Sequence, residues 1–313
     1  MKNLFTADAM QSNLGFVTSQ TSHIEAGVYR IKYPDIQYQS LIPVDTSANP
    51  WSKSVTYFSM DGRGQAGWIS GKANDIPLVG TSMEKFETSV YMAGIGYDYG
   101  LEEVGQAQMM GVNLGNEKAM VARRAYEEMV DAVALTGDAE KGFEGLFSYT
   151  GVTADTAPNG AGGNPEWSTK TPDEIIADVN AMLIAINSAT NTVAMADTVL
   201  LPVANLQLIA STRLTDTAMT ILDFIKKANV YTATTGQELT IRGTRGLATA
   251  GAAGVARAVA YRRSPEVLKL HIPMAHRFLP VQVIGLQYVI PGIFRLGGLD
   301  IRLPKEVRYM DGV

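Results

Sequence analysis

The residues best suited to chemistry lie in the stretch ALTGDAEKGFEGL, residues 134–146, with three glycines, three acids and one lysine. A phosphate loop would need Lys-Ser or Lys-Thr after its second glycine, but Phe143 and Glu144 follow there, and the acids would repel phosphate. A calcium loop starting at Asp138 would need glycine and glutamate where the chain has Phe143 and Tyr149. We therefore interpret Gly137 as the left-handed residue that ends a helix, followed by a tight turn.

The stretch GRGQAG, from Gly62 to Gly67, matches the glycine pattern of a dinucleotide-binding loop. That motif needs a helix directly after it, and Gly71 and Pro77 interrupt the residues that follow. The context predicts a glycine-rich hairpin tip. The competing hypothesis, a nucleotide-dependent enzyme, predicts saturable nucleotide binding by the monomer, and its absence in calorimetry would remove that hypothesis.

The remaining nucleophiles and metal ligands lack a motif. The chain has no cysteine, which excludes disulfides, zinc–thiolate sites, iron–sulfur clusters and cysteine nucleophiles. His23, His271 and His276 belong to no His-Glu-x-x-His pattern, and no Gly-x-Ser-x-Gly is present. We interpret the histidines as structural.

Two further groups of polar residues could be mistaken for sites. Glu127, Glu128 and Asp131 look like a carboxylate cluster, but arginines one turn earlier indicate a solvated, charged helix face. The stretch NGAGGN, residues 159–164, has no Lys-Ser or Lys-Thr after it and is interpreted as a mobile loop. The sequence thus predicts no catalytic residue, no cofactor site and no metal site.

Composition narrows the function classes. The 313 residues are 46% hydrophobic, enough for a sizeable core. Charged residues make up 18%, below the roughly 25% usual in soluble domains, which fits a surface partly covered by neighbouring subunits. A net charge of −5 argues against a dedicated nucleic-acid binder. The N-terminus has no apolar signal-peptide core and no segment is apolar enough to span a membrane, so we expect synthesis in the cytoplasm.

The elements follow from hydrophobic spacing. Residues 28–44 are rich in β-formers, and residues 51–99 form a long β-excursion in which Asp61-Gly62 is a hairpin turn signal. Apolar residues recurring every four positions predict a helix over 101–135, up to about 50 Å long unless Gly111 and Gly115 bend or break it.

The second half alternates before becoming mostly β. Thr171, Pro172 and Glu174 form a capping box that opens a helix running to about Ser188. A short buried strand in DTVLLP and helices near 203–213 and 217–228 come next, and residues 229–313 are mostly β. This order predicts an α+β chain whose early and late strands share a sheet.

The order of parts resembles the Hong Kong 97-type major capsid proteins of tailed bacteriophages, whose fold encapsulin shells share. The segment YRIKYPDIQYQSLIPVDTSANPWSKSVTYFSMDGRGQA is similar to the start of one phage and prophage branch. The residues after the long helix that carry the resemblance are Gly137, Asp138, Gly142, Gly145 and Leu146.

The resemblance implies a division of the chain into named parts. These are an N-terminal arm (1–27), P-domain strands (28–50), an extended E-loop (51–99), the P-domain spine helix with its turn (100–149), an A-domain (150–266) and terminal strands returning to the P-domain (267–313). It also implies two sets of residues. The E-loop candidates for subunit contact are Tyr57, Arg63, Trp68 and Lys72, and the domain-joint candidates are Gly137, Gly142 and Gly145.

By the same resemblance, the chain is a non-enzymatic major capsid protein. It would assemble with itself into hexamers and pentamers, forming the icosahedral virion head around double-stranded DNA without sequence-specific binding, in the bacterial host cytoplasm. The β region begins by residue 28, so we expect a separate scaffold protein, or none, besides a portal and decoration proteins. No motif supports an intersubunit crosslink at the loop lysines. The alternative is an encapsulin-type compartment, distinguished by an internal groove for a cargo peptide.

Overall fold

The computed structural model describes residues 35–68, 78–110, 114–215 and 217–313. Contacts divide the chain into two units, Met1–Asp35 and Ile36–Val313, and the second contains all the described helices and strands. The expected N-terminal arm lies outside the described residues. No helix in the described part is long and apolar enough to cross a membrane.

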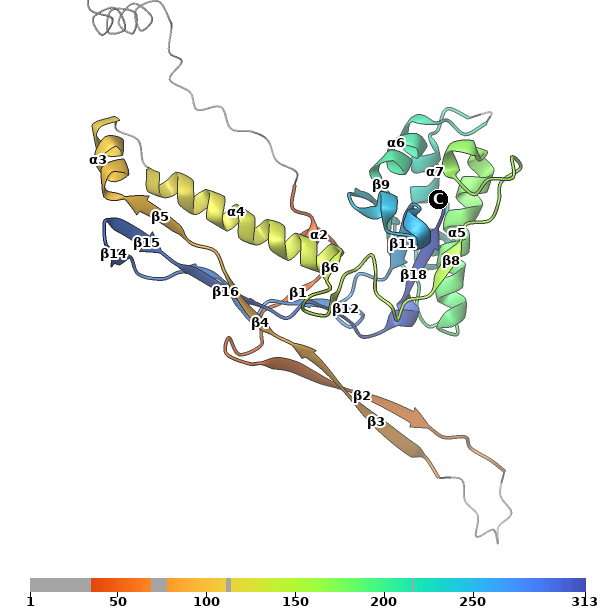
Figure 1. The fold of residues 1–313 in the computed structure, drawn as a ribbon. Helices are drawn as coiled ribbons and strands as arrows, with labels where there is room; N and C mark the ends of the chain where they lie inside the picture. The colour runs from red at the N-terminus through yellow and green to blue at the C-terminus, as the bar shows by residue number, and fades with distance from the viewer. Residues whose placement is uncertain (1–34, 69–77, 111–113, 216) are drawn as a thin grey trace, which may run out of the picture. The chain divides into compact units, whose positions relative to one another are not determined.

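Figure 1 shows the helices and strands of this unit. The helices are α2 (Tyr38–Leu41), α3 (Leu101–Met110), α4 (Leu114–Leu135), α5 (Pro172–Ala189), α6 (Val203–Ser211), α7 (Ile221–Lys227) and α8 (Val230–Thr235). The strands are β1 (Val44–Asp45), β2 (Ser54–Arg63), β3 (Gly80–Ser89), β4 (Tyr91–Gly94), β5 (Tyr97–Gly100), β6 (Gly137–Asp138), β7 (Phe143–Glu144), β8 (Ala154–Thr156), β9 (Thr198–Pro202), β10 (Thr240–Thr244), β11 (Arg257–Tyr261), β12 (Leu268–His271), β13 (Met274–Phe278), β14 (Gln282–Ile284), β15 (Gln287–Ile290), β16 (Gly292–Leu296), β17 (Leu299–Ile301) and β18 (Val307–Asp311).

A five-stranded mixed sheet, ordered β10-β9-β11-β18-β8, separates two hydrophobic cores. In β11, Ala258 and Ala260 join the core that contains the buried side chains of α5, α6 and α7. Val259 and Tyr261 point the other way, into the core that contains the buried side chains of α4. Because both faces are covered, the central strands are fully buried apolar runs rather than alternating ones.

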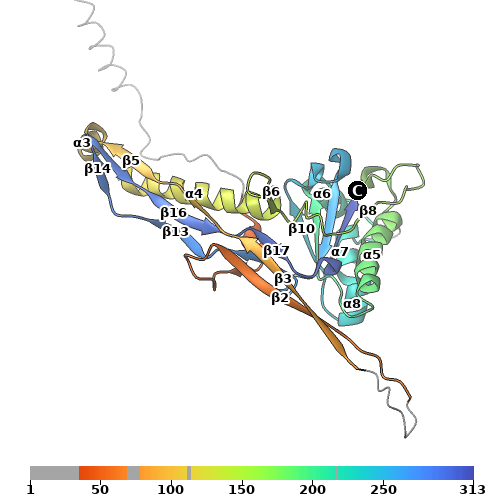
Figure 2. The ribbon, with the colours of Figure 1, turned by 60° about the horizontal axis from the view of Figure 1, so that its bottom comes forward.

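The early and late strands share sheets, as the sequence predicted. Three small sheets, β1-β12-β17, β13-β16-β4 and β14-β15-β5, each combine a strand from residues 44–100 with later ones. Figures 1 and 2 both show α4 lying along these sheets. Tyr126 of α4 packs edge-on against Phe294 of β16, with ring centroids 4.7 Å apart. The sheets and helix thus form one layered body, and β4 and β5 belong to it rather than to β2 and β3.

The last strand corrects the expectation that all of 267–313 returns to this layer. β18 pairs with β11 and β8 in the five-stranded sheet. Its successive side chains serve opposite cores, since Tyr309 enters one and Met310 the other. Asp311 then forms a buried ion pair with Arg257 of β11.

The region 28–50 also differs from expectation in its described part. Instead of continuous strand, α2 forms at Tyr38–Leu41, and only Val44–Asp45 is extended. Asp131 of α4 explains this, because its Oδ1 accepts hydrogen bonds from the backbone N–H groups of Gln37 and Tyr38 at 2.9 and 2.8 Å. A carboxylate from a distant helix thus overrides a local β preference.

The predicted turn at Asp61-Gly62 is wrong. Both residues lie inside β2, paired with Ser82 and Thr81, and the ladder runs in unbroken register to Arg63 and Gly80. The pairing of β2 with β3 continues past Asp61-Gly62 to Arg63 and Gly80, so the segment that connects the two strands is residues 64–79.

The helices follow the sequence more closely. The expected helix over 101–135 is present as α3 and α4, with 111–113 outside the description. The 22 residues of α4 span about 33 Å. The capping box at Thr171 and Glu174 is confirmed. The sequence missed α8, which Asn229 caps through its side chain, and extended α7 too far toward its N-terminus, where Thr220 is the cap.

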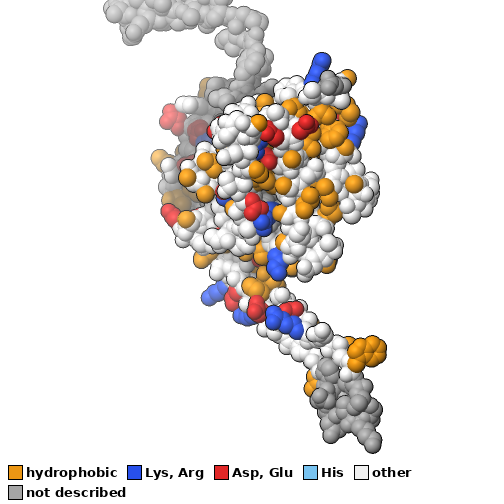
Figure 3. Space-filling model, turned by 90° about the vertical axis from the view of Figure 1, so that its right-hand side faces the viewer, with side chains coloured by type: hydrophobic (Ala, Val, Ile, Leu, Met, Phe, Trp, Pro, Cys, Tyr) orange, Lys and Arg blue, Asp and Glu red, His pale blue; other side chains and the backbone are white. Residues whose placement is uncertain are grey.

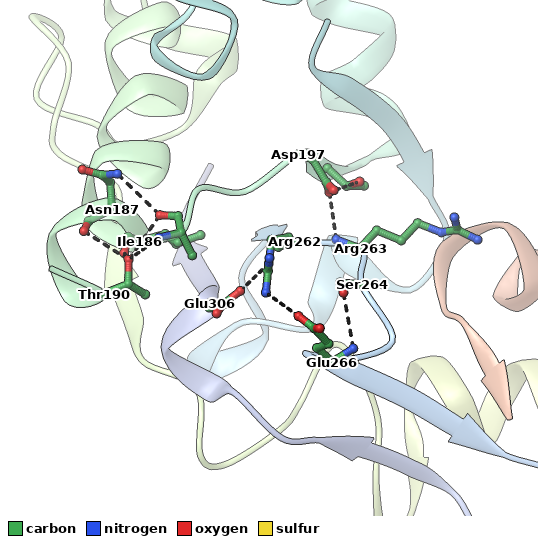
Figure 4. A network of polar contacts seen from close by, with 11 residues as sticks. Ile186, Asn187, Thr190, Asp197, Arg262, Arg263, Ser264, Glu266 and Glu306 are labelled. Atoms are coloured by element: carbon green, nitrogen blue, oxygen red, sulfur yellow. Dashed lines mark hydrogen bonds and ion pairs between the residues drawn. The ribbon is translucent and has the colours of Figure 1, made fainter. Parts of the chain in front are cut away.

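A polar network holds the segment that leads from β11 to β12 (Figure 4). Arg262 donates to Glu306 at 2.6 Å and pairs with Glu266 at 3.4 Å. The backbone N–H of Arg263 donates to Asp197 at 2.8 Å. The segment between the five-stranded sheet and the small sheets is therefore held by Asp197 and Glu306, which directly precede β9 and β18.

Candidate functional site

The turn after α4 is closed by hydrogen bonds from nearby residues of its own chain. Gly137 has a φ of 91°, which confirms the left-handed helix end predicted from the sequence. β6 and β7 then pair across the turn, and Asp138 accepts the backbone N–H of Glu140 at 3.0 Å. Glu144 accepts a hydrogen bond from the Thr150 hydroxyl at 2.6 Å. Two of the four charged groups of this stretch, Asp138 and Glu144, therefore accept hydrogen bonds from nearby residues of the same chain.

In the described residues, the GRGQAG stretch does not lead into the helix that a dinucleotide-binding loop requires. Gly62 and Arg63 are the last residues of β2, and residues 64–68 are exposed without regular structure. Residues 69–77, where a binding helix would have to start, lie outside the description.

The carboxylates of α4 correct the interpretation of a solvated face. Asp131 caps α2, and Glu127 accepts the Tyr38 hydroxyl at 2.7 Å. Only Glu128 keeps the predicted role, paired with Arg124 at 2.7 Å. Two of these three acids therefore attach a chain segment to the helix.

The two described histidines are both buried. His276 has its Nε2 3.1 Å from the carbonyl oxygen of Ile95 and stacks on Tyr126 at a centroid distance of 5.3 Å. His271 lies between the carboxylates of Asp45 and Asp300. In the described part of the chain, no three metal-ligating side chains gather.

The strongest functional feature is instead a surface on the ribbon formed by β2 and β3. The ribbon pairs only with itself among the described strands. Directly opposed residues share a face, so Lys85, which lies opposite Phe58, is on one side of the ribbon together with three apolar residues, Phe58, Met60 and Met83. Their exposures are 63%, 67% and 64%. We call these three residues the apolar ribbon face.

The opposite side of the ribbon is polar beyond its root. Ser59 opposes Glu84 there, and Asp61 opposes Ser82. Figure 3 shows positive and negative side chains close together on the ribbon, with hydrophobic ones nearby. A two-stranded ribbon is at best marginally stable by itself in water, so an apolar face of this kind is a candidate contact surface.

The ribbon root is anchored within the subunit. Tyr57 stacks on Phe86 with ring centroids 5.1 Å apart, and the Arg302 guanidinium lies 4.5 Å above the Tyr57 ring. Burial raises the pKa of Tyr57 to about 12, helped by the Asp300 and Tyr149 charges and opposed by Arg302. The hydroxyl is therefore neutral at physiological pH, and the ring packs as an aromatic group under a cation.

The sequence-predicted contact residues are spread along this ribbon and its loop. Tyr57 is half-buried against its own subunit, Arg63 is exposed and pairs with Asp61 at 3.2 Å, and Trp68 is fully exposed. Lys72 lies outside the described residues. The sequence missed the apolar ribbon face, although the alternation of Phe58 and Met60 with polar neighbours was the signal for it.

The predicted joint glycines have different surroundings. A Cβ on Gly137 would lie 2.5 Å from the Phe143 carbonyl oxygen, and one on Gly145 would lie 2.4 Å from that of Leu135. Gly142 has a φ of 71° but nothing within 4 Å of a Cβ. The backbone contact at Gly137 and Gly145 leaves no room for a side chain.

Alanine substitutions should separate these roles. We expect Gly137→Ala and Gly145→Ala to lower the free energy of unfolding by about 2–3 kcal/mol, because neighbouring backbone must move. Gly142→Ala should cost only about 1 kcal/mol for its left-handed backbone. Urea unfolding of the soluble subunit measures all three, and equal losses would contradict the steric account.

Known families and solved structures match this chain over most of its length. The family described as major capsid protein matches residues 64–313. The fold is similar to the capsid of Myoviridae phage XM1, with a TM-score of 0.78, 18% identity and 100% of both chains covered. It is also similar to the capsid of the native GTA particle (TM-score 0.63, 10% identity, 98% of this chain and 99% of that one).

A third similar structure is a virus-like particle from Pyrococcus furiosus, with a TM-score of 0.53, 12% identity, and coverage of 87% of this chain and 91% of that one. The search of curated protein sequences found no match. At these identities the structural likeness shows the fold, and it confirms the α+β capsid fold expected from the sequence.

Proposed function

We propose, from the premise that this chain belongs to the major capsid protein family, that its copies assemble into hexamers and pentamers. These would close into the icosahedral head shell of a phage around double-stranded DNA. The chain is a head-shell protein by family and by fold, since phage capsid subunits match it along its whole length. Hexamers, pentamers and enclosed DNA are the proposed part.

The observation that carries the proposal is the apolar ribbon face. It belongs to a ribbon that no other described strand pairs with, and its side chains are more than half exposed. We assign the E-loop to Ser54–Ser89, shorter than the 51–99 expected from sequence, because β4 and β5 pair with late strands. Such a ribbon reaching a different surface of the next copy is a heterologous contact, and heterologous contacts build closed rings when the rotation between copies closes.

Charge substitutions on the two ribbon faces test this assignment. Met60→Asp with Met83→Asp should prevent assembly or raise the required protein concentration more than tenfold, because burying each methionine contributes about 1.5–3 kcal/mol. Light scattering against protein concentration measures the threshold.

The matched control places two aspartates on the polar side, as Ser59→Asp with Ser82→Asp. The control creates two directly opposed acid pairs, with Glu84 and with Asp61, whereas the test variant creates one, so like-charge repulsion within the ribbon is at least as large in the control. The control should assemble close to wild type. Equal assembly by both double variants would remove the apolar ribbon face from the interface.

A second exposed apolar group lies at the hairpin tip between β14 and β15. Val283, Ile284 and Leu286 are 69%, 59% and 75% exposed, and Gly285 turns the chain with a φ of 62°. We propose this tip as a further contact between copies.

The remaining roles are proposed on family grounds and composition. We propose that the protein is not an enzyme and that it encloses DNA without binding its sequence, as a net charge of −5 suits a container. Assembly in the host cytoplasm, a scaffold, a portal and decoration proteins belong to the same proposal. Calorimetry with nucleotides tests the proposal that the protein is not an enzyme. Saturable nucleotide binding by the monomer would favour the nucleotide-dependent enzyme instead.

The encapsulin-type alternative is not better supported than the phage head, since the matching family is that of major capsid proteins.

A further inference from the structure

His271 is a buried histidine held between two acids of neighbouring strands. It lies on β12, directly opposite Asp45 of β1, while β17 on the other side carries Asp300. Its Nδ1 is 3.5 Å from Asp45 Oδ2, and its Nε2 is 3.7 Å from Asp300 Oδ2. The residue is 1% exposed.

Neither ring nitrogen of His271 has a hydrogen-bond partner among the residues that the structure describes. A neutral imidazole has one N–H and one lone pair, so one nitrogen must present its lone pair to a carboxylate oxygen. A protonated imidazole has a donor on each side and can pair with both acids. The site therefore discriminates between the two charge states, and histidine side chains commonly change charge between about pH 5 and 8.

The charged groups around His271 come from each strand beside it. On its own strand, Lys269 is 3.7 Å from Asp45. Burial alone would raise the pKa of Asp45, but hydrogen bonds from Ser47 and the Lys269 charge lower it, and a protonated His271 lowers it further. Asp45 is thus an established anion facing one ring nitrogen. The loop at Gly297 packs on the His271 Cβ without adding charge.

Asp300 connects this histidine to the ribbon root. The same Asp300 Oδ2 that faces His271 accepts a hydrogen bond from Arg302 Nε at 3.1 Å. Arg302 in turn lies over the ring of Tyr57 in β2. Asp300 also lines a cleft of about 300 Å³ with Glu87 at the ribbon root. One carboxylate oxygen is therefore shared between the buried imidazole and the cation that holds the ribbon.

We propose that His271 is a proton switch for the ribbon root. A proton taken up by the imidazole draws Asp300 toward His271 and weakens the hold of Arg302 on Tyr57. The ribbon is then firmly seated when His271 is neutral and freer when it is charged. The consequence for assembly rests on the proposed role of the ribbon as the contact between copies.

The test is amide hydrogen exchange, followed by mass spectrometry, on the full-length unassembled chain at about pH 5.5 and 7.5, corrected for intrinsic exchange rates. In the wild type, peptides from the root of β2 and β3 should exchange about two- to tenfold faster at the lower pH, the factor expected for losing one hydrogen bond. His271→Gln should remove this pH dependence. Arg302→Gln should give fast exchange at both pH values.

Ring NMR of histidine-labelled protein supplies a second readout, with His276 as the internal comparison and His271→Gln as the assignment. A His271 ring that does not change charge between about pH 5 and 8 would overturn the proposal. Identical pH dependence in wild type and His271→Gln would do the same. If His271→Gln does not fold, Arg302→Gln and the NMR titration still decide. Because the subunit is unassembled, failure to form shells bears on the proposed function alone.

Discussion

Replacing residues 59–84 by Asn-Gly should abolish shell formation while leaving a folded subunit. Phe58 and Lys85 are directly opposed in the ladder, so a two-residue turn can join them. The change removes Met60 and Met83 but keeps the stack of Tyr57 on Phe86. None of the described residues removed belongs to either hydrophobic core.

We expect this variant to lose assembly while keeping the stability of the subunit. Circular dichroism and thermal unfolding should differ little from wild type, by a few degrees at most, because surface changes away from a core usually cost about 0.5 kcal/mol or less. Size-exclusion chromatography and electron microscopy should find subunits without shells. Normal shells from this variant would refute the role of the ribbon, and an unfolded subunit would show that the ribbon supports the core.

Asp311→Asn should destabilise the folded subunit more than any of the glycine substitutions, by about 3–5 kcal/mol. Asp311 accepts from Arg257 Nε at 2.6 Å and from its second terminal nitrogen at 2.8 Å, and the side chains are 9% and 10% exposed. Arg257 also donates to the Phe147 carbonyl at 2.7 Å and lies over the Tyr309 ring. The substitution leaves a buried guanidinium without its counter-charge.

The pH dependence of this loss has a definite sign. Burial alone would raise the pKa of Asp311, but hydrogen bonds from Arg257 and Ala252 and the Arg257 charge lower it. A carboxyl group whose pKa is lowered in the folded state stabilises the folded subunit at pH values above its pKa in the unfolded chain, about 3.9. This stabilisation is lost as the pH falls through the pKa of the folded state. The difference between wild type and Asp311→Asn should therefore be full at neutral pH and shrink in acid.

Asp155→Asn is the matched control for this experiment. Asp155 also forms a two-point pair, with Arg308 at 2.6 and 2.8 Å, but its side chain is 39% exposed. Water screening should limit the loss to about 1 kcal/mol or less. Urea unfolding of both variants between neutral and acid pH compares them, and similar losses would contradict the argument from burial.

Local signals predicted the parts of this fold that depend on local chemistry. The capping residues Thr171 and Glu174 and the left-handed Gly137 act within one turn of the chain, so the sequence correctly placed the start of α5 and the end of α4. The continuous apolar run of β9 likewise indicated a buried strand from neighbouring residues alone. The order of these elements also carried the family resemblance that the comparisons confirm.

The parts of the fold that the sequence did not predict depend on contacts between residues far apart in the chain. A β-rich segment became α2 because Asp131, more than ninety positions away, accepts its N–H groups. The position of β18 in the five-stranded sheet depends on the ion pair between Asp311 and Arg257. It also depends on the two hydrophobic cores, which exist only in the folded chain. The apolar ribbon face depended on the register of β2 with β3, and a turn misplaced at Asp61-Gly62 hid that register.

Negative-stain electron microscopy of the chain expressed alone tests the central claim most directly. The account predicts closed shells, or rings of five or six subunits that enlarge to shells as the protein is concentrated. A compact monomer that persists across a wide range of salt and protein concentration would contradict it.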